Sequence, residues 1–335
     1  MRVLFLLTGG TIMMTAPASG LGHALPSDSA LAARNLAQEV PSLARVADIE
    51  TRFVCNMDSA DMQPSDWVVL AKAVHAALAT GDYAGVVVVH GTDTMAYSAS
   101  ALGLMLGPLP APVVLTGAQR PLAEARTDAR QNLIDAALTA TMDVPEVTIA
   151  FGSRVFRGVR ATKSDARALH AFESPSCAPL VELGVGIERA AHVRPRGDLA
   201  PFDARLDARV LAVRIFPGLD PSLVRGALAT GVRGLVLEAY GSGTLPHLAG
   251  SLMPAIAEAR EREVPVLVVS QSLRGKVELG GYEGGRRAQA EGAISGGDMT
   301  VEAAVAKMMI GLGRHGAGEE LSAFLTRDVA GERTE

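Results

Sequence analysis

The chain has 335 residues, enough for two domains of ordinary size or one large domain, and 48% of them are hydrophobic, which excludes a disordered protein. The net charge is -5 and the basic residues are scattered singly, so we expect no binding to nucleic acid or to a membrane surface. Two cysteines cannot build a disulfide framework and the seven histidines form no metal-ligand motif, so we expect neither a cofactor nor a metal ion.

The N-terminus does not have the pattern of a targeting signal. One arginine and five apolar residues precede a pair of glycines, which is too short for a secretory signal, and no small-residue cleavage site follows. No apolar run in the chain approaches the roughly 18 to 20 residues that span a bilayer. We therefore expect a cytoplasmic protein.

The first predicted strand covers residues 3–7, an unbroken apolar run typical of a strand buried on both faces of a parallel sheet. Gly9 and Gly10 end this run and allow the backbone to turn sharply and approach a ligand. Thr11 then lies just past the carboxyl end of the strand, where open α/β sheets bind their ligands. Its hydroxyl is either a nucleophile or an ordinary capping group, and this stretch alone favours the capping group.

The next segment, residues 13–28, is rich in small residues and proline and lacks sustained periodicity. Directly after a candidate nucleophile, such a segment indicates either a mobile lid or a plain surface loop. A strand at 48–55 and a polar loop containing Ser59 follow. A helix is predicted at 64–79, with a buried stripe formed by Val69, Ala73, Ala76 and Ala77.

Two further apolar strands also end in polar side chains. The run at 85–89 leads into His90 and then G-T-D-T, and the run at 112–115 leads into T-G-A-Q. Because the carboxyl ends of parallel strands meet at one edge of a sheet, the polar residues of all three segments are expected to converge there. These residues are Thr8, Thr11, Thr92, Asp93, Thr116 and Gln119.

Alternation of helices and strands sets the predicted fold class. Helices at 94–106 and 124–141 and a strand at 147–151 continue a doubly wound sheet, and residues 154–163 form a hairpin arm. The alternation restarts after the linker. Strands are expected at 210–216, 234–239 and 264–270, and helices at 221–230, 252–262, 300–313 and 319–326. We therefore predict a two-domain α/β protein, with a larger N-terminal doubly wound domain at 1–190, a linker at 191–209 and a smaller C-terminal α/β domain at 210–335.

Three motifs carry a resemblance to a known family. T-G-G-T-I at 8–12, H-G-T-D-T-M-A at 90–96 and T-G-A-Q at 116–119 resemble the bacterial L-asparaginases. The longer run H-G-T-D-T-M-A-Y-S-A-S-A-L and the sequence D-M-T-V-E-A near the C-terminus are similar to the cytoplasmic type I branch. The resemblance covers essentially the whole chain.

The resemblance implies a role for each matching residue. Thr11 corresponds to the attacking threonine, and Thr92, Asp93 and Lys163 to the groups that assist it. Lys163 is one of only four lysines beside 27 arginines, and a lysine, unlike an arginine, can release its proton in a protein. Without the resemblance, a surface salt bridge would be the simpler interpretation of Lys163.

Substrate binding is implied in the same way. The substrate would be L-asparagine, converted to L-aspartate and ammonia through an ester of the threonine. Its ammonium suits Asp93 and its carboxylate suits Ser59, with Thr92 and the carbonyl of Ala118 completing the substrate site. The resemblance also implies a homodimer or a homotetramer.

Two departures from the family pattern affect these expectations. The family lid usually carries a tyrosine near the attacking threonine, but no tyrosine precedes Tyr83 in this chain; Thr15, Ser19 or His23 are the candidates to replace it. Thr244 stands where relatives often have asparagine, in a segment that reaches a neighbouring subunit's site in the family.

Two alternatives stay open from the sequence, and two more are disfavoured. An amidase that prefers glutamine or another β-amide would use the same motifs. A non-catalytic amino-acid sensor would explain the missing tyrosine. The tRNA-linked amidotransferase subunit shares the motifs but carries an added N-terminal domain, whereas the T-G-G-T strand starts here at residue 3. A nucleotide-binding protein is disfavoured, because T-G-G-T lacks the glycine patterns that cradle phosphates.

Overall fold

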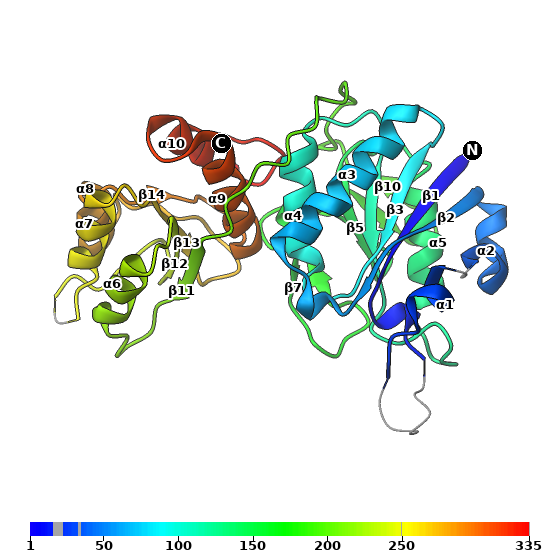
Figure 1. Ribbon diagram of the computed structural model, residues 1–335, viewed down its shortest axis with the longest axis horizontal. Coiled ribbons are helices and arrows are strands. Elements are labelled where there is room, and N and C mark those ends of the chain that lie inside the picture. Colours follow the sequence, from blue (N-terminus) through cyan, green and yellow to red (C-terminus); the bar gives the residue numbers. More distant parts are fainter. Residues whose placement is uncertain (16–22, 33–34, 249, 335) are drawn as a thin grey trace. The chain divides into compact units, whose positions relative to one another are not determined.

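A computed structural model describes residues 1–15, 23–32, 35–248 and 250–334 of the protein (Figure 1). The chain forms two compact units, Met1–Asp203 and Ala204–Glu335. The predicted fold class is confirmed, since a larger N-terminal α/β unit is followed by a smaller C-terminal α/β unit.

The N-terminal unit is built on an eight-stranded sheet of order β10-β9-β6-β5-β4-β3-β1-β2. The strands β2, β1, β3, β4 and β5 run parallel, and β6, β9 and β10 extend the sheet in antiparallel fashion beyond β5. Their bounds are β1 Arg2–Gly9, β2 Asp48–Met57, β3 Gly85–Val89, β4 Val113–Thr116, β5 Val147–Phe151, β6 Arg154–Arg157, β9 Val181–Leu183 and β10 Ile187–Arg189.

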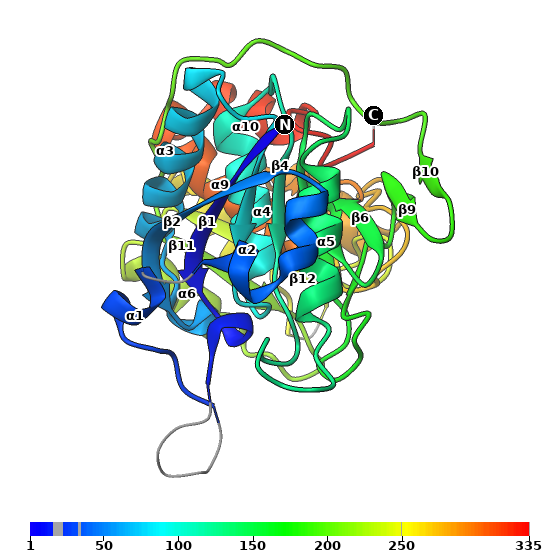
Figure 2. The same cartoon turned by 90° about the vertical axis from the view of Figure 1, so that its right-hand side faces the viewer.

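Helices cover both faces of this sheet. The helices α3 (Pro64–Thr80) and α4 (Met95–Leu106) lie on one side, and α5 (Ala129–Thr139) and α2 (Leu36–Glu39) lie on the other (Figures 1 and 2). The central strands β1, β3 and β4 are therefore buried on both faces, which explains why they read as unbroken apolar runs rather than alternating ones.

The order of the parallel strands fixes where a ligand can bind. The chain passes from β1 to β2 on one side and then returns to β3 on the other side of β1, so the direction of winding reverses between β1 and β3. In open α/β sheets, the loops that leave the carboxyl ends of such a strand pair diverge and leave a crevice. The loops that follow β1 and β3 contain Thr11 and Thr92.

The predicted buried stripe of α3 is wrong at three of its four positions. Val69 is 54% exposed, Ala76 is exposed and Ala73 is half-buried, and only Ala77 belongs to the buried face. The buried residues of α3 are Trp67, Leu70, Ala71, Val74, Ala77 and Leu78. A run of alanines and valines fits several helical faces equally well, and the large Trp67 and Leu70 decide which face turns inward.

Short elements connect the sheet to the candidate site. The 3₁₀ turns η1 (Thr11–Met13) and η3 (Ser59–Asp61) follow β1 and β2, and η4 (Gly158–Arg160) follows β6. The arm predicted at 154–163 is divided into β6, η4 and β7 (Thr162–Lys163), and β7 pairs in antiparallel fashion with β8 (Phe172–Glu173). The remaining short elements of this unit are α1 (Asp28–Ala32) and η2 (Pro41–Arg45).

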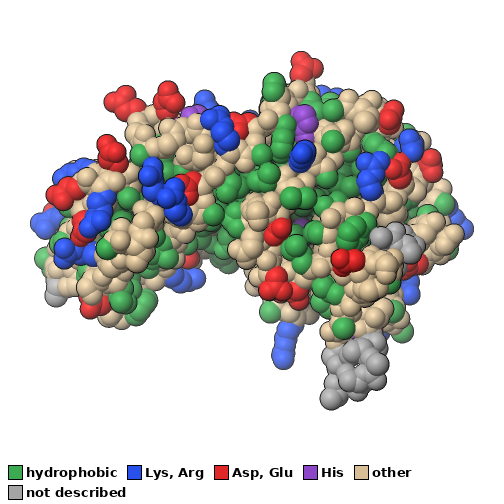
Figure 3. All heavy atoms as spheres, viewed as in Figure 1, with side chains coloured by type: hydrophobic (Ala, Val, Ile, Leu, Met, Phe, Trp, Pro, Cys, Tyr) green, Lys and Arg blue, Asp and Glu red, His purple; other side chains and the backbone are tan. Residues whose placement is uncertain are grey.

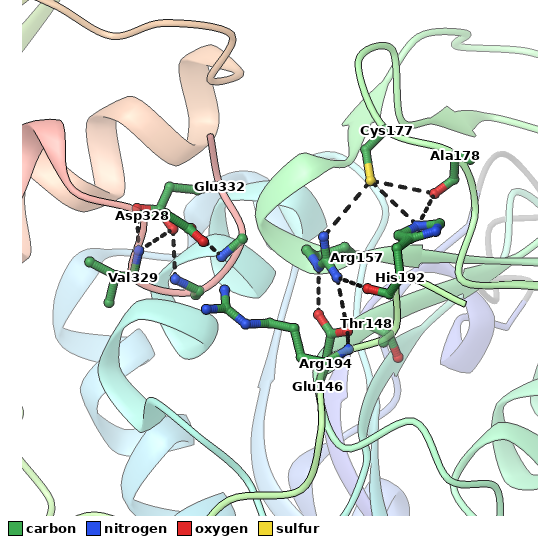
Figure 4. A network of polar contacts seen from close by, with 12 residues as sticks. Glu146, Thr148, Arg157, Cys177, Ala178, His192, Arg194, Asp328, Val329 and Glu332 are labelled. Atoms are coloured by element: carbon green, nitrogen blue, oxygen red, sulfur yellow. Dashed lines mark hydrogen bonds and ion pairs between the residues drawn. The ribbon is translucent and has the colours of Figure 1, made fainter. Parts of the chain in front are cut away.

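A buried ion pair fixes the chain where it leaves the large sheet. Arg157 Nη2 donates to Glu146 Oε1 at 3.0 Å and to the His192 carbonyl oxygen at 2.8 Å (Figure 4). The Arg194 N–H donates to the same Glu146 oxygen at 2.7 Å. The side chains of Arg157 and Glu146 are only 10% and 5% exposed, so each charge depends on the other for its stabilisation. From 190 to 209 the chain forms no helix or strand.

The C-terminal unit has a four-stranded parallel sheet of order β11-β12-β13-β14. Its elements are β11 Val210–Arg214, α6 Pro221–Ala229, β12 Gly234–Ala239, α7 Met253–Glu261, β13 Val266–Ser270, α8 Glu283–Ala290, β14 Ile294–Ser295, α9 Val301–His315 and α10 Glu319–Thr326. Sequence periodicity missed α8, which is rich in Arg and Gly, and β14, which has only two residues.

Charged side chains of both signs are interspersed on the face drawn in Figure 3, and neither sign gathers in a continuous patch there. Among the described residues, no helix combines the length and the apolar character of a membrane span.

A second buried ion pair anchors the C-terminal tail within its own unit. Lys307 of α9 donates to Glu332 Oε1 and to the Arg327 carbonyl oxygen, and both charged side chains are fully buried. The N–H groups of Val329 and Ala330 also donate to the Glu332 carboxylate (Figure 4). Burial alone would raise the pKa of Glu332, but the pair with Lys307 and these donors outweigh it and lower that pKa.

Replacing Lys307 by Met should leave the Glu332 carboxylate buried and unpaired. We expect the free energy of unfolding of the C-terminal unit to fall by roughly 3 to 5 kcal/mol, measured by urea denaturation. The matched control is Lys276→Met, which removes an ion pair whose lysine side chain is 66% exposed and should leave stability close to that of the wild type. Equal losses for the two variants would contradict this prediction.

Candidate active site

The loop after β1 brings Thr11 close to the loop after β3. Gly9 and Gly10 have φ angles of 99° and 80°, which favour glycine, and η1 begins directly at Thr11. A Cβ atom at Gly10 would lie 2.5 Å from the backbone nitrogen of Gly91, so only glycine permits this approach. Thr11 is half-buried and directly follows Gly10, which lies against the Gly91 backbone.

Lys163 joins two residues of the loop after β3. Its Nζ lies 2.9 Å from Thr92 Oγ1 and 2.6 Å from Asp93 Oδ1. The Lys163 side chain is 19% exposed and that of Asp93 is 63% exposed, so the ion pair lies at the mouth of the site rather than in the protein interior. Lys163 is therefore in direct contact with Thr92 and Asp93, two of the three residues predicted to act with it.

Aromatic packing places Lys163 at this edge of the sheet. Lys163 of β7 pairs with Phe172 of β8. The Phe172 ring packs against Phe151, the last residue of β5, with 5.0 Å between the ring centroids. The small β7–β8 ribbon is thereby attached to the carboxyl end of the large sheet, and Lys163 is brought next to Thr92 although 71 positions separate them in the sequence.

Ser59 also lies within this loop cluster. It begins η3, whose preceding residue Asp58 accepts a hydrogen bond from the Ala60 N–H at 3.0 Å. A Cβ atom at Gly91 would lie 2.5 Å from Ser59 Oγ, and Thr94 Oγ1 donates to the Ser59 carbonyl oxygen at 2.7 Å. The Ser59 hydroxyl therefore packs against the backbone next to Thr92.

The T-G-A-Q loop contacts both threonine-bearing loops. Thr92 Oγ1 donates to Gln119 Oε1 at 3.2 Å, and the Leu122 N–H donates to the Ile12 carbonyl oxygen at 3.1 Å. The Ala118 side chain is 1% exposed and packs in the core, so only its backbone could face a substrate.

Two of the six converging residues stabilise the sheet instead of forming the site. Thr8 Oγ1 donates to the Val89 carbonyl oxygen at 2.9 Å, and Thr116 Oγ1 donates to the Ala150 carbonyl oxygen at 2.8 Å. Both side chains are buried and join neighbouring strands. Position at a strand end was not sufficient to separate these threonines from Thr11 and Thr92.

Of the candidates to replace the missing tyrosine, the two that the structure describes, His23 and Thr15, are directed elsewhere than at the Thr92–Lys163 pair. The imidazole of His23 is directed at Glu124, with 3.3 Å from Nε2 to Oε1. Thr15 is exposed and pairs through its backbone with Ala24. Ser19 lies outside the described residues, as do residues 16–22 of the predicted lid.

His90 is a buried neutral residue that supports the loop after β3. Its Nδ1 lies 2.6 Å from the Gly91 carbonyl oxygen and must carry the hydrogen, while its Nε2 lies 3.1 Å from Met62 Sδ. Burial lowers the pKa of His90 to about 4, although the bond to the Gly91 carbonyl opposes this shift. His90 therefore holds the turn before Thr92 without carrying charge at neutral pH.

Sequence reasoning missed Asp128 and Asn132, which hold the T-G-A-Q loop from beneath. Asp128 accepts from the N–H groups of Gln119 and Arg120 at 2.9 and 3.0 Å, and Asn132 donates to the Gly117 carbonyl oxygen at 2.9 Å. The sequence does carry a signal for this support, since Asp128 precedes Asn132 by four residues at the start of a helix. The same pattern is typical of ordinary helix capping, so it did not identify a loop contact.

The assembled groups suit acyl transfer by a hydroxyl nucleophile. Two threonine hydroxyls, one ammonium and one carboxylate lie at the sheet edge, and a carbonyl carbon needs a nucleophile, a proton relay and charge stabilisation. Among residues 1–15, 23–32, 35–248 and 250–334, no three His, Cys, Asp or Glu side chains gather where they could hold a metal ion.

Comparisons with known proteins agree along the whole chain. Residues 2–194 match the family profile described as Asparaginase, N-terminal, and residues 209–325 match the Glutaminase/Asparaginase C-terminal domain. The L-asparaginase of Thermococcus kodakarensis is 40% identical over 336 residues, which span 100% of this chain and 99% of the relative. L-asparaginase 1 of Escherichia coli K12 is 39% identical over 281 residues, 83% of this chain and 82% of the relative. The crystal structure of L-asparaginase I from Vibrio cholerae superposes with a TM-score of 0.86 at 33% identity, covering 100% of this chain and 99% of that chain.

The buried His90 should make the protein less stable in acid. Because its pKa is about 4 in the folded chain and 6.5 in the unfolded chain, the unfolded state binds the proton first. Between these values the free energy of unfolding should fall by up to about 3 kcal/mol, measured by urea denaturation as pH is lowered. His90→Asn keeps an N–H donor near Gly91 but cannot titrate, so its stability should lack this part of the slope. An equal slope in wild type and variant would contradict the prediction.

Proposed function

The chain belongs to the asparaginase family, and on this premise we propose that it hydrolyses the side-chain amide of L-asparagine to L-aspartate and ammonia. The observation that carries the proposal is the contact of Lys163 Nζ with both Thr92 Oγ1 and Asp93 Oδ1 at 2.9 and 2.6 Å. This trio lies beside the glycine turn that carries Thr11. A nucleophile next to a hydroxyl and a lysine is one arrangement that can carry out amide cleavage.

Charge complementarity supports an amino-acid substrate. The carboxylate of Asp93 is largely exposed at the mouth of the site, so it is suited to receive the substrate ammonium. We assign the substrate carboxylate to Ser59 and the neighbouring backbone N–H groups, because the Ser59 hydroxyl packs directly against Gly91. Thr92 and the carbonyl of Ala118 complete the proposed substrate site.

In the first step, Thr11 Oγ attacks the amide carbon of the substrate. A C–O bond forms, the C–N bond breaks, and the hydroxyl proton of Thr11 passes to the departing nitrogen, which leaves as ammonia. Thr92 and Lys163 relay this proton and stabilise the charge that develops during the transfer. The product of this step is a β-aspartyl ester of Thr11.

In the second step, water attacks the ester carbon. A new C–O bond forms, the ester bond to Thr11 breaks, and one proton of the water returns to Thr11 Oγ. We assign the same Thr92–Lys163 pair to hold this water and relay its proton. Free L-aspartate is released and the resting hydroxyl of Thr11 is restored.

An ammonia-release assay tests the proposal directly. Wild-type protein should release ammonia from L-asparagine, and Thr11→Ala should abolish this release because no nucleophile is left. Thr92→Val and Lys163→Met should each lower kcat by orders of magnitude, since the residues of a relay act as a unit. The matched control is Thr8→Val, which removes a hydroxyl bonded to the Val89 carbonyl and should retain most of the activity.

Full activity of Thr11→Ala would refute the assigned nucleophile. Parallel assays with L-glutamine and other β-amides would identify an amidase of different preference. Calorimetric binding of L-asparagine without turnover would instead support the sensor hypothesis, and either result would replace the proposed substrate or reaction.

We infer further that the protein acts as a homodimer or homotetramer. Large apolar side chains are exposed at the carboxyl edge of the C-terminal sheet, where single copies of a protein rarely leave such a group uncovered. They are Phe216 (54% exposed), Leu248 (75%), Leu273 (54%) and Tyr282 (62%). The cytoplasmic location and the domain limits expected from the sequence stay predictions.

Light scattering coupled to size-exclusion chromatography tests the oligomer. Leu248→Glu combined with Leu273→Glu should shift the wild-type oligomer to monomer, because charged side chains would have to be buried between the copies. Val69→Glu is the control, since Val69 is 54% exposed on α3 of the other unit. A monomeric wild-type protein would overturn the inference.

A further inference from the structure

The hydroxyl of Thr92 is the middle member of a hydrogen-bond chain with a fixed direction. Gln119 Nε2 donates to the Ala168 carbonyl oxygen at 3.3 Å, and a carbonyl oxygen can only accept. The amide of Gln119 must therefore turn its oxygen toward Thr92, which lies 3.2 Å away. The Lys163 ammonium can only donate, so in the resting site the Thr92 oxygen must accept from Lys163 and give its own hydrogen to Gln119.

Asp128 holds Gln119 in place from beneath the loop. Asp128 stands at the N-cap position of α5, yet its side chain does not cap that helix. Its Oδ2 accepts from the Gln119 N–H at 2.9 Å and its Oδ1 accepts from the Arg120 N–H at 3.0 Å. Both carboxylate oxygens are thus directed at the backbone of the T-G-A-Q loop and not at the helix.

Asn132, one helical turn later, completes this support. Its Nδ2 donates to Asp128 Oδ2 at 3.1 Å and to the Gly117 carbonyl oxygen at 2.9 Å, and its Oδ1 accepts from the Gly152 N–H at 3.2 Å. Asp128 and Asn132 are 9% and 2% exposed, so water competes little with these bonds. The loop that carries Gln119 is therefore rigidly attached to α5 and to the end of β5.

We propose that Gln119 is a positioning residue that orients the Thr92 hydroxyl, and that Asp128 positions Gln119. The inference rests on the proposed function, since it assigns a task to Gln119 within the Thr92–Lys163 relay. With its hydrogen held by Gln119, Thr92 presents its lone pairs to Lys163 and to the reaction space. Without Gln119 the hydroxyl would rotate, and in part of the molecules its hydrogen, not a lone pair, would point toward the substrate or the water.

Gln119→Leu removes the acceptor and should affect the chemical step more than binding. We expect kcat for L-asparagine to fall by about 10- to 100-fold while KM changes by less than about threefold, because Gln119 acts through Thr92 and makes no proposed contact with the substrate. Gln131→Leu is the matched control, since Gln131 donates to Asp135 on the same helix, α5, and should leave both parameters unchanged.

Gln119→Glu gives a pH readout that a merely structural role would not give. A protonated Glu keeps one donor for the Ala168 carbonyl and one acceptor for Thr92, so it copies the glutamine amide. An ionised Glu has no donor and would repel that carbonyl oxygen. At low pH, Gln119→Glu should therefore be more active than Gln119→Leu. This advantage should be lost as pH rises and the new carboxyl group ionises. The pH profile of the wild-type activity should lack this step, because glutamine does not titrate.

Asp128→Asn provides a second variant that leaves Gln119 itself intact. An amide can accept from only one of the two N–H groups with its oxygen and places N–H donors against the other, so the loop should loosen. We expect a loss of kcat in the same direction as for Gln119→Leu, with a similar KM. Urea denaturation of every variant identifies the folded ones, and only these are compared.

Two results would overturn the inference. One is a folded Gln119→Leu protein with wild-type kcat and an unaltered pH profile in Gln119→Glu. The other is a neutron crystal structure of Gln119→Leu in which the Thr92 hydroxyl hydrogen still has one fixed direction. A wild-type protein that releases no ammonia would refute the proposed function instead, and the neutron structure would then still decide whether Gln119 orients the Thr92 hydroxyl.

Discussion

The contact between Lys163 and the Thr92–Asp93 pair is the interaction on which the candidate site depends. Lys163 lies 71 positions after Thr92 in the sequence, and its Nζ satisfies an oxygen of each partner. An exposed ion pair of this kind contributes little to stability. Its importance lies in geometry, because it holds the Lys163 ammonium against the Thr92 hydroxyl. The large sheet holds the loop after β3, which carries Thr92 and Asp93, and the β7–β8 ribbon holds Lys163 next to that loop.

Buried groups beneath the site supply the rigidity that the exposed groups lack. His90 fixes the turn before Thr92, Asp128 and Asn132 hold the T-G-A-Q loop, and the glycine turn after β1 lies against Gly91. The contacts of Asp128 and Asn132 join the T-G-A-Q loop to α5, and the glycine turn packs the loop after β1 against the loop after β3. Reactive side chains are thereby carried on short loops whose backbone positions are determined by the sheet.

Sequence and structure agree best where one physical signal dominates. The unbroken apolar strands β1, β3 and β4 were predicted because burial on both faces leaves no alternative pattern, and the family assignment from the three motifs is confirmed by the profile matches. Agreement fails where several patterns compete. The alanine-rich helix α3 allowed a wrong buried face, and the antiparallel strands β9 and β10 are only three residues long, too short to give a periodicity.

The sequence by itself determined the α/β alternation, which follows from local apolar periodicity, and the family, which follows from contiguous motifs. The candidate residues Thr11, Thr92, Asp93, Lys163 and Ser59 follow from the resemblance that these motifs carry. Only the tertiary structure decided which converging threonines face the site and which bond to the backbone of neighbouring strands. It alone also revealed the direction of the hydrogen-bond chain from Lys163 through Thr92 to Gln119, and the support of that chain by Asp128. These features depend on which donors and acceptors meet in space, and residues far apart in the chain leave no local pattern from which such pairings could be predicted.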